Sequence, residues 1–276
     1  MIYDATRCTL GEGPLWHPER NELFWFDILS KQMRTRDRTW QFETYVSAAG
    51  WIDADTLMVA SAKGLHRFDI VTGASEDICA LEADNPVTRS NVGRADPQGG
   101  FWIGTMGIKG EPGAGAYYRY YKGELRQLWT NWTIPNATCF SPDGRTAYFA
   151  DTPHKKILKV ALDADGWPAG GPEVFIDLTG TPYNPDGAVV DSHGNLWNAQ
   201  WGAHRVACHG PDGKFLTAIG VPAEQSSCPA FGGEGLSTLF VTSAADGLDD
   251  PLNPHHGRTF AVETGVTGQR EHQVIL

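Results

Sequence analysis

The 276-residue chain is predicted to adopt an all-β fold, and three observations support this. No long segment carries apolar residues at the 3.6-residue spacing of an amphipathic helix. Short aromatic or apolar runs alternate with turns rich in Gly, Asp and Pro. One such run recurs six times, roughly every 45 residues, which is typical of repeat architectures. Together these features predict a six-bladed β-propeller with four-stranded antiparallel blades around a central channel.

The recurring run is the clearest strand of each predicted blade. In chain order the runs are LFWFDI (23–28), LMVAS (57–61), FWIGTM (101–106), AYFADT (147–152), LWNAQW (196–201) and LFVTSA (239–244). Each follows a turn: HPERNE, DADT, DPQGG, SPDGRT, DSHGN and GGEGLST. Further alternating segments, such as GLHRFDIVTG and KKILKVALDADG, follow several runs and supply the remaining strands. The chain length allows about 46 residues for each blade, a typical propeller repeat.

We expect the ring to close through the chain ends. The N-terminal segment would pair with the last blade, which contains RTFAVETGVTGQREHQVIL (258–276). The WD dipeptide of the common WD40 propellers is absent. No change in composition marks a linker, so residues 1–276 are predicted to form one domain.

Charge and cysteine content narrow the function classes. The net charge is −11 with a pI near 5.2, and no basic cluster offsets it. Such a surface repels nucleic acids and anionic membranes, so neither is an expected partner. No C-x-x-C pair occurs, and the start, MIYDATRCTLGEGPLW, is not a secretory signal. We therefore expect a cytoplasmic protein that is a monomer or a weak homo-oligomer. Its thiols should be reduced, at Cys8, Cys79, Cys139, Cys208 and Cys228.

Aligning the repeats on their turns places four polar residues in register. The residue six positions before the turn is Glu12, Asn91, Asn136 or Asp186 in four repeats. Each begins the first strand of its blade, the strand that lines the channel of a propeller. We therefore expect these carboxylates and amides to lie at one level around the axis. In blades two and six the same count reaches Ser47 and Cys228.

The same register separates three Pro-Asp-Gly tripeptides, which are ordinary turn signals. Asp143 and Asp212 fall within turns, in FSPDGRT and HGPDGKF. Asp186 instead begins a first strand, in PDGAVVDSHGN. Asp186 is therefore predicted to serve chemistry, and the other two aspartates to form turns.

Oxygen side chains that converge on one point form a cation site. Carboxylate and amide oxygens are hard ligands that suit Ca²⁺, Mg²⁺ or Mn²⁺. Three or four protein oxygens leave coordination positions for water and substrate, as a catalytic site requires. Asn and Asp also begin strands for purely structural reasons, but four in register favour a channel site.

With these residues placed, the sequence resembles the SMP-30/gluconolactonase/regucalcin-like family. The resemblance spans nearly the whole chain and lies in LGEGPLWHP, TRSNVGRADPQGGFWIGTMG, PNATCFSPDGRTAYFADT, PDGAVVDSHGNLWNAQWG and CPAFGGEGLSTLFVTSA. It implies a six-bladed propeller with one divalent cation in its channel and hydrolysis of sugar lactones.

Carried over by position, the resemblance implies roles for individual residues. The metal ligands would be Glu12, Asn136 and Asp186, and the substrate contacts Arg89, Asn91 and Glu111. Asp186 is in addition the expected catalytic residue, accepting a proton from water. One position departs from the family, which usually reads R-x-N-D-G: here Val92 replaces the aspartate.

The expected function is hydrolysis of a sugar (aldono-) lactone such as gluconolactone, xylonolactone, arabinolactone or galactonolactone, with one divalent cation (Ca²⁺, Zn²⁺, Mn²⁺, Mg²⁺ or Fe²⁺). Two alternatives use the same scaffold: a calcium-binding, non-enzymatic protein like regucalcin, and a hydrolase of other esters or organophosphates. An enzyme is favoured by the expected substrate contacts Arg89, Asn91 and Glu111. A protein that only binds calcium needs no residues that contact a sugar.

Overall fold

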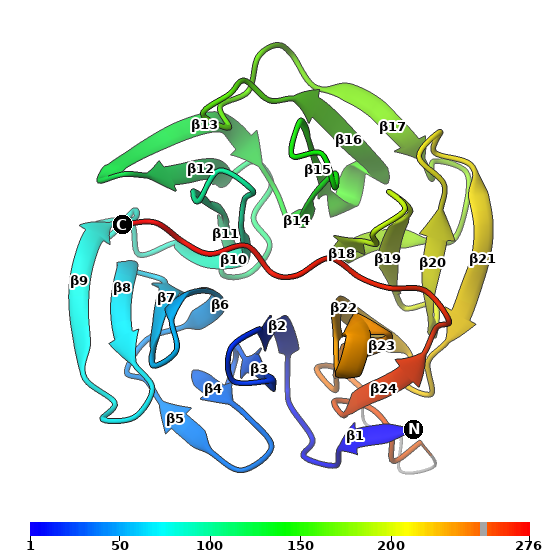
Figure 1. Cartoon of the computed structure of the whole chain (residues 1–276), viewed down its shortest axis with the longest axis horizontal. Helices are drawn as coiled ribbons and strands as arrows, with labels where there is room; N and C mark the ends of the chain where they lie inside the picture. Colours follow the sequence, from blue (N-terminus) through cyan, green and yellow to red (C-terminus); the bar gives the residue numbers. More distant parts are fainter. Residues whose placement is uncertain (249–252) are drawn as a thin grey trace.

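The structure, a computed structural model, describes residues 1–248 and 253–276 and consists mainly of β-strands. Six four-stranded antiparallel sheets form the blades of a ring (Figure 1). The first strand of each blade lies nearest the axis and the last lies at the rim. The predicted six-bladed propeller is confirmed.

Each of the first five blades is a continuous piece of chain. Blade one contains β2 (Gly11–His17), β3 (Glu22–Asp27), β4 (Gln32–Arg34) and β5 (Thr39–Gln41); blade two β6 (Val46–Asp53), β7 (Thr56–Ser61), β8 (Gly64–Asp69) and β9 (Ser75–Ala80); blade three β10 (Thr88–Ala95), β11 (Phe101–Gly107), β12 (Gly115–Tyr121) and β13 (Glu124–Trp132). Blade four contains β14 (Pro135–Phe140), β15 (Thr146–Asp151), β16 (Lys156–Ala161) and β17 (Glu173–Asp177); blade five β18 (Asn184–Val190), β19 (Leu196–Trp201), β20 (Arg205–His209) and β21 (Phe215–Gly220).

Blade six joins the two ends of the sequence. It contains β22 (Gln225–Gly232), β23 (Thr238–Ala244), β24 (Thr259–Glu263) and β1 (Ile2–Asp4). Strands β1 and β24 pair antiparallel, with Ile2 opposite Phe260, so the predicted closure is confirmed. The six recurring runs are the second strands of the blades, β3, β7, β11, β15, β19 and β23.

Helical structure is confined to two short 3₁₀ turns in the part of the chain that the structure describes. They are η1 (Thr152–His154) and η2 (Glu234–Leu236). No helix in this part is long and apolar enough to cross a membrane.

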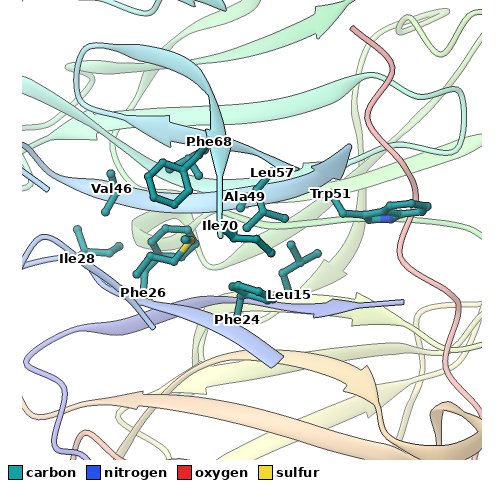
Figure 2. Close-up of a cluster of buried hydrophobic side chains, with 12 residues drawn as sticks. Leu15, Phe24, Phe26, Ile28, Val46, Ala49, Trp51, Leu57, Phe68 and Ile70 are labelled. Carbon is teal, nitrogen blue, oxygen red and sulfur yellow. The ribbon is translucent and has the colours of Figure 1, made fainter. Parts of the chain in front are cut away.

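The hydrophobic core lies between the blades rather than at the axis. Six clusters of buried side chains occupy the six blade–blade interfaces. Figure 2 shows the cluster between blades one and two, where Phe24 and Phe26 of β3 face Val46 and Leu57 of blade two. Burying both faces of each blade in this way removes apolar surface from water without filling the centre. The channel is therefore free to carry polar groups.

Every inner strand has a β-bulge at the same level. The pairing with the second strand shifts register between Glu12 and Leu15, Val46 and Ala48, Ser90 and Gly93, Asn136 and Cys139, Pro185 and Ala188, and Ser226 and Pro229. A bulge bends its strand and re-aims the side chains beside it. Two of the bulges contain backbone in the left-handed region, at Gly13 (φ 55°) and Ala137 (φ 58°). The repeated bulge is how the six inner strands turn selected side chains toward the axis.

After β24, residues 264–276 leave the blade and run across one face of the ring, in red in Figure 1. We call this segment the C-terminal strap. Gln269 Nε2 donates hydrogen bonds to the carbonyls of Phe140 (3.1 Å) and Val190 (2.9 Å), in blades four and five. Near the C-terminus, the backbone amides of Val274 and Ile275 donate hydrogen bonds to backbone carbonyls of blades two and three. The strap thus connects blade six to four other blades.

A buried ion pair fixes the middle of the strap. Arg94 Nη2 of β10 lies 3.5 Å from Glu271 Oε1, and the two side chains are only 11% and 7% exposed. Burial alone would lower the pKa of Arg94, but the Glu271 carboxylate overcomes this and raises it. Trp51 Nε1 donates to the Glu271 carbonyl (2.9 Å), which holds the strap over blade two. Breaking this ion pair would leave a buried cation without a partner.

The substitution Glu271→Gln tests the strap. It is expected to lower the free energy of unfolding by about 3 kcal/mol, because it leaves Arg94 buried and unpaired. Glu124→Gln removes the exposed pair with Arg126 (49% and 56% exposed) and should change stability by less than about 1 kcal/mol. Denaturant unfolding measures both; equal, small losses would contradict a structural role for the strap.

Gly187 in the bulge of β18 provides a second test. A Cβ atom at this position would collide with the Cβ and Sγ atoms of Cys228 in blade six. Gly187→Ala is therefore expected to destabilise the fold by about 2 kcal/mol or more. Gly220→Ala is the matched control, since a Cβ there meets nothing within 4 Å. A Tm for Gly187→Ala as high as that of the control would show that blades five and six are not closely packed at the bulge.

Candidate active site

The four residues in register line one cavity at the axis. Glu12 (β2), Asn91 (β10), Asn136 (β14) and Asp186 (β18) all contribute to a cavity of about 420 Å³. Arg89 of β10 joins them in the cavity wall. Apolar side chains make up much of the remaining wall, namely Leu10, Leu29, Met106, Ile108, Ile134 and Trp201. A polar group at the base of a largely apolar cavity is typical of a small-molecule site.

Glu12 and Asp186 are two carboxylates held close together with little compensation. Burial raises the pKa of Glu12 to about 7, against the opposing effects of the Gly13 amide and Arg89. Burial, and then the charge of Glu12, raise the pKa of Asp186 well above its usual value. In the described residues, neither carboxylate has a Lys, Arg or His nitrogen within 4.0 Å. A buried anion (Asp186) and a half-buried one (Glu12) without such a partner favour a bound cation or proton.

The donor set fits a hard divalent cation. Glu12 and Asp186 offer carboxylate oxygens and Asn136 an amide oxygen, the ligand types that Ca²⁺, Mg²⁺ and Mn²⁺ prefer. A soft site would need thiolates, and all five cysteines lie outside the residues that line this cavity. A cation would also offset the repulsion from Glu12 that helps to raise the pKa of Asp186.

Arg89 and Asn91 form a second polar group beside the carboxylates. Arg89 Nη1 donates to Asn91 Oδ1 (2.9 Å) and to the Ser90 carbonyl (2.8 Å). Arg89 is 5% exposed and its Nε has no hydrogen-bond partner in the described residues. Burial lowers the pKa of Arg89 to about 10, so it stays protonated near neutral pH. A buried guanidinium with an unused donor can bind a substrate oxygen.

The Asn136 side chain contacts two neighbouring side chains, Thr152 and Asn91. Its Nδ2 donates to Thr152 Oγ1 (2.9 Å), and Thr152 Oγ1 donates to the Pro185 carbonyl (2.7 Å), next to Asp186. Asn91 Nδ2 lies 3.4 Å from Asn136 Oδ1 and donates to the Pro135 carbonyl (2.9 Å). Blades three, four and five are thereby connected by one row of polar side chains.

Two residues that the sequence singled out, Glu111 and Val92, do not line the cavity. Glu111 is absent from the cavity lining; its Oε2 accepts from the Lys109 amide (2.9 Å), while Lys109 and Gly110 line the mouth. Val92 packs against the cluster between blades three and four, outside the cavity lining. The structure therefore brings together Glu12, Arg89, Asn91, Asn136 and Asp186, but not Glu111.

The cavity also contains residues that the sequence reasoning missed. Thr152 directly follows β15, and Trp201 is the last residue of β19. Both stand where a second strand reaches the mouth of the channel. Registering the second strands on each other, as was done for the first strands, would have found these two positions.

A serine–histidine–aspartate arrangement occurs elsewhere, in blade two. Ser61 Oγ lies 2.7 Å from His66 Nε2, and His66 Nδ1 lies 2.8 Å from Asp77 Oδ1. Ser61 is only 2% exposed, and its Oγ accepts from the amides of Lys63 (3.0 Å) and Gly64 (3.2 Å). This buried hydroxyl stabilises a turn and is not accessible to a substrate. The channel cavity is the better candidate active site.

Comparison with known proteins shows which family this chain resembles. Residues 10–245 match the family described as SMP-30/gluconolactonase/LRE-like region. The chain is 39% identical to an L-arabinolactonase of Azospirillum brasilense, over 95% of this chain and 91% of the relative. It is 32% identical to a pentonolactonase of Haloferax volcanii, over 96% of this chain and 94% of the relative. The crystal structure of a calcium-binding protein, regucalcin, from Agrobacterium tumefaciens superposes with a TM-score of 0.96 at 40% identity, covering 100% of this chain and 97% of the other.

The paired carboxylates predict how stability of the metal-free protein depends on pH. The pKa of Glu12 rises from 4.5 to about 7 on folding, so below pH 4.5 its contribution to stability is complete. That contribution is lost as the pH rises through 7, because the folded state must then give up a proton it favours. Between pH 5 and pH 8 we expect a loss of about 2 kcal/mol, allowing for solvent at the cavity wall.

Thermal unfolding in a chelator measures this loss. The Tm should fall from pH 5 to pH 8 in the wild type, and Mn²⁺ added at pH 8 should reverse the fall. Glu12→Gln should make the fall smaller, and the part that remains is due to Asp186, which stays buried; the surface variant Glu124→Gln should show the full fall. A Tm that is equally high at pH 8 without metal would contradict the proposed strain between the carboxylates.

Proposed function

The chain belongs to the SMP-30/gluconolactonase/LRE-like family and is a lactonase, and we propose that it hydrolyses a sugar aldonolactone with a divalent cation held by Glu12, Asn136 and Asp186. Candidate substrates are arabinolactone, xylonolactone, gluconolactone and galactonolactone. Arabinolactone and xylonolactone are favoured, because relatives at 39% and 32% identity are named L-arabinolactonase and pentonolactonase.

One observation carries this proposal: two neighbouring carboxylates, Glu12 half-buried and Asp186 buried, line a cavity that also contains the buried Arg89, and neither forms an ion pair. The cavity volume of about 420 Å³ accommodates a five- or six-membered sugar lactone. A propeller that binds neither a cation nor a substrate has no need for these groups, and burying them uncompensated is unfavourable.

The cation would be held by one oxygen-bearing side chain from each of blades one, four and five. When bound, it supplies a Lewis acid that polarises the lactone carbonyl and lowers the pKa of water. The three ligands contain only oxygen donors, which favours Ca²⁺, Mg²⁺ or Mn²⁺ over Zn²⁺ or Fe²⁺.

Asp186 is proposed to accept a proton from the attacking water. The water oxygen bonds to the carbonyl carbon while its proton moves to an Asp186 oxygen. The bond between that carbon and the ring oxygen then breaks, and Asp186 returns the proton to the ring oxygen, which becomes the new hydroxyl of the sugar acid.

Arg89 and Asn91 are proposed to position the sugar. The unused Nε of Arg89 can donate to a ring hydroxyl or to the carbonyl oxygen. Lys109 and Gly110 at the mouth can contact the far end of the ring. Glu111 contributes to the substrate site by fixing the Lys109 backbone rather than by lining the cavity.

A calcium-binding role without catalysis is the second candidate, since one similar structure is described as a calcium-binding protein, regucalcin. It accounts for the carboxylates but leaves the buried Arg89 and the apolar wall without a role. Hydrolysis of other esters would use the same groups, and a panel of esters separates it from lactone specificity.

The substitution Asp186→Asn tests the proposal. It keeps the side-chain shape but removes a charge and the proton acceptor, so kcat/KM for L-arabinolactone is expected to fall at least about 100-fold. Asp212→Asn is the matched control, because it alters the same tripeptide in an exposed turn and should retain wild-type kcat/KM. A pH-stat assay with Ca²⁺, Mg²⁺ or Mn²⁺ measures both. Full activity in Asp186→Asn would overturn the proposal.

A further inference from the structure

The hydroxyl of Thr152 stands between two of the residues that are proposed to bind the cation. It accepts from Asn136 Nδ2 (2.9 Å) and donates to the carbonyl of Pro185 (2.7 Å), the residue before Asp186. Thr152 is itself fixed, because its backbone amide donates to the Ile134 carbonyl (3.1 Å). The position of the hydroxyl is therefore set by blade four and not by a flexible loop.

The direction of each hydrogen bond in this row follows from simple chemistry. A carbonyl oxygen can only accept, so the single hydroxyl proton of Thr152 must be donated to Pro185. The oxygen of Thr152 is then left as an acceptor toward Asn136. The amide of Asn136 must meet it with its NH₂ group, which turns Oδ1 the other way.

The same rule applies on the other side of Asn136. Asn91 Nδ2 donates to the Pro135 carbonyl (2.9 Å), so its NH₂ group is fixed by an obligate acceptor. That NH₂ group also faces Asn136 Oδ1 at 3.4 Å, which agrees with an oxygen and not a nitrogen at this position. Both neighbours thus favour one of the two orientations of the Asn136 amide.

Amide orientation matters because the two ends of an asparagine side chain are opposite in character. The oxygen binds a cation, whereas the NH₂ group repels one. An asparagine free to flip would lose part of its affinity to the wrong orientation. We propose that Thr152 is a positioning residue that locks the Asn136 amide with its oxygen toward the cation site. This inference rests on the cation-dependent function proposed above.

The experiment compares Thr152→Val with Thr152→Ser by titrating Mn²⁺ into metal-free protein. Valine keeps the branched shape but lacks the hydroxyl, so the apparent Kd for Mn²⁺ should rise about 10- to 100-fold. Serine keeps the hydroxyl and should stay within about threefold of the wild type. A role limited to packing would be preserved by valine and would leave the Kd for Mn²⁺ unchanged.

A double-mutant cycle shows whether Thr152 acts through Asn136. In an Asn136→Ala background, Thr152→Val should weaken Mn²⁺ binding no further, because no amide remains to be oriented. Equal Mn²⁺ affinity in Thr152→Val and the wild type would overturn the inference and leave the proposed function standing. Additive losses in the cycle would also overturn it. A wild type that binds no divalent cation would overturn the proposed function, and this inference with it.

Discussion

The structure depends on burying apolar surface between blades instead of at the centre. Six separate clusters stabilise the six interfaces, so the axis can remain lined with polar groups. The repeated β-bulge then turns one or two side chains of each inner strand inward at the same level. Because the ring is closed by β1 and β24 and crossed by the C-terminal strap, the inner strands are held at fixed separations. A site made from residues far apart in the sequence can then be as well ordered as the blades themselves.

The site uses this rigidity to hold an unfavourable arrangement. Glu12 and Asp186 repel each other in a partly dry cavity, and the surrounding clusters supply the stability that keeps them there. Polar side chains around them have fixed directions: Arg89 toward Asn91, Asn91 toward the Pro135 carbonyl, and Asn136 toward Thr152. Such preorganisation reduces the rearrangement needed when a cation and a lactone bind.

The sequence predicts the fold and most of the candidate site because both follow from the repeat. The first strand and its turn keep a constant spacing, so Glu12, Asn91, Asn136 and Asp186 could be placed by counting six residues back. Glu111 could not be placed this way, because it lies in a loop whose path depends on local contacts such as its bond to the Lys109 amide. The spacing of the second strands gives the position of Thr152, but not its role, which depends on its hydrogen bond to Asn136. The strap was missed because many of its contacts are to backbone groups, which leave no pattern in the side chains.

The central claim is that one divalent cation lies between Glu12, Asn136 and Asp186. Anomalous diffraction from crystals soaked in Mn²⁺ tests it most directly. The account predicts a single strong peak in the channel, next to the side-chain oxygens of these three residues. No peak there, or a peak only at the protein surface, would contradict it.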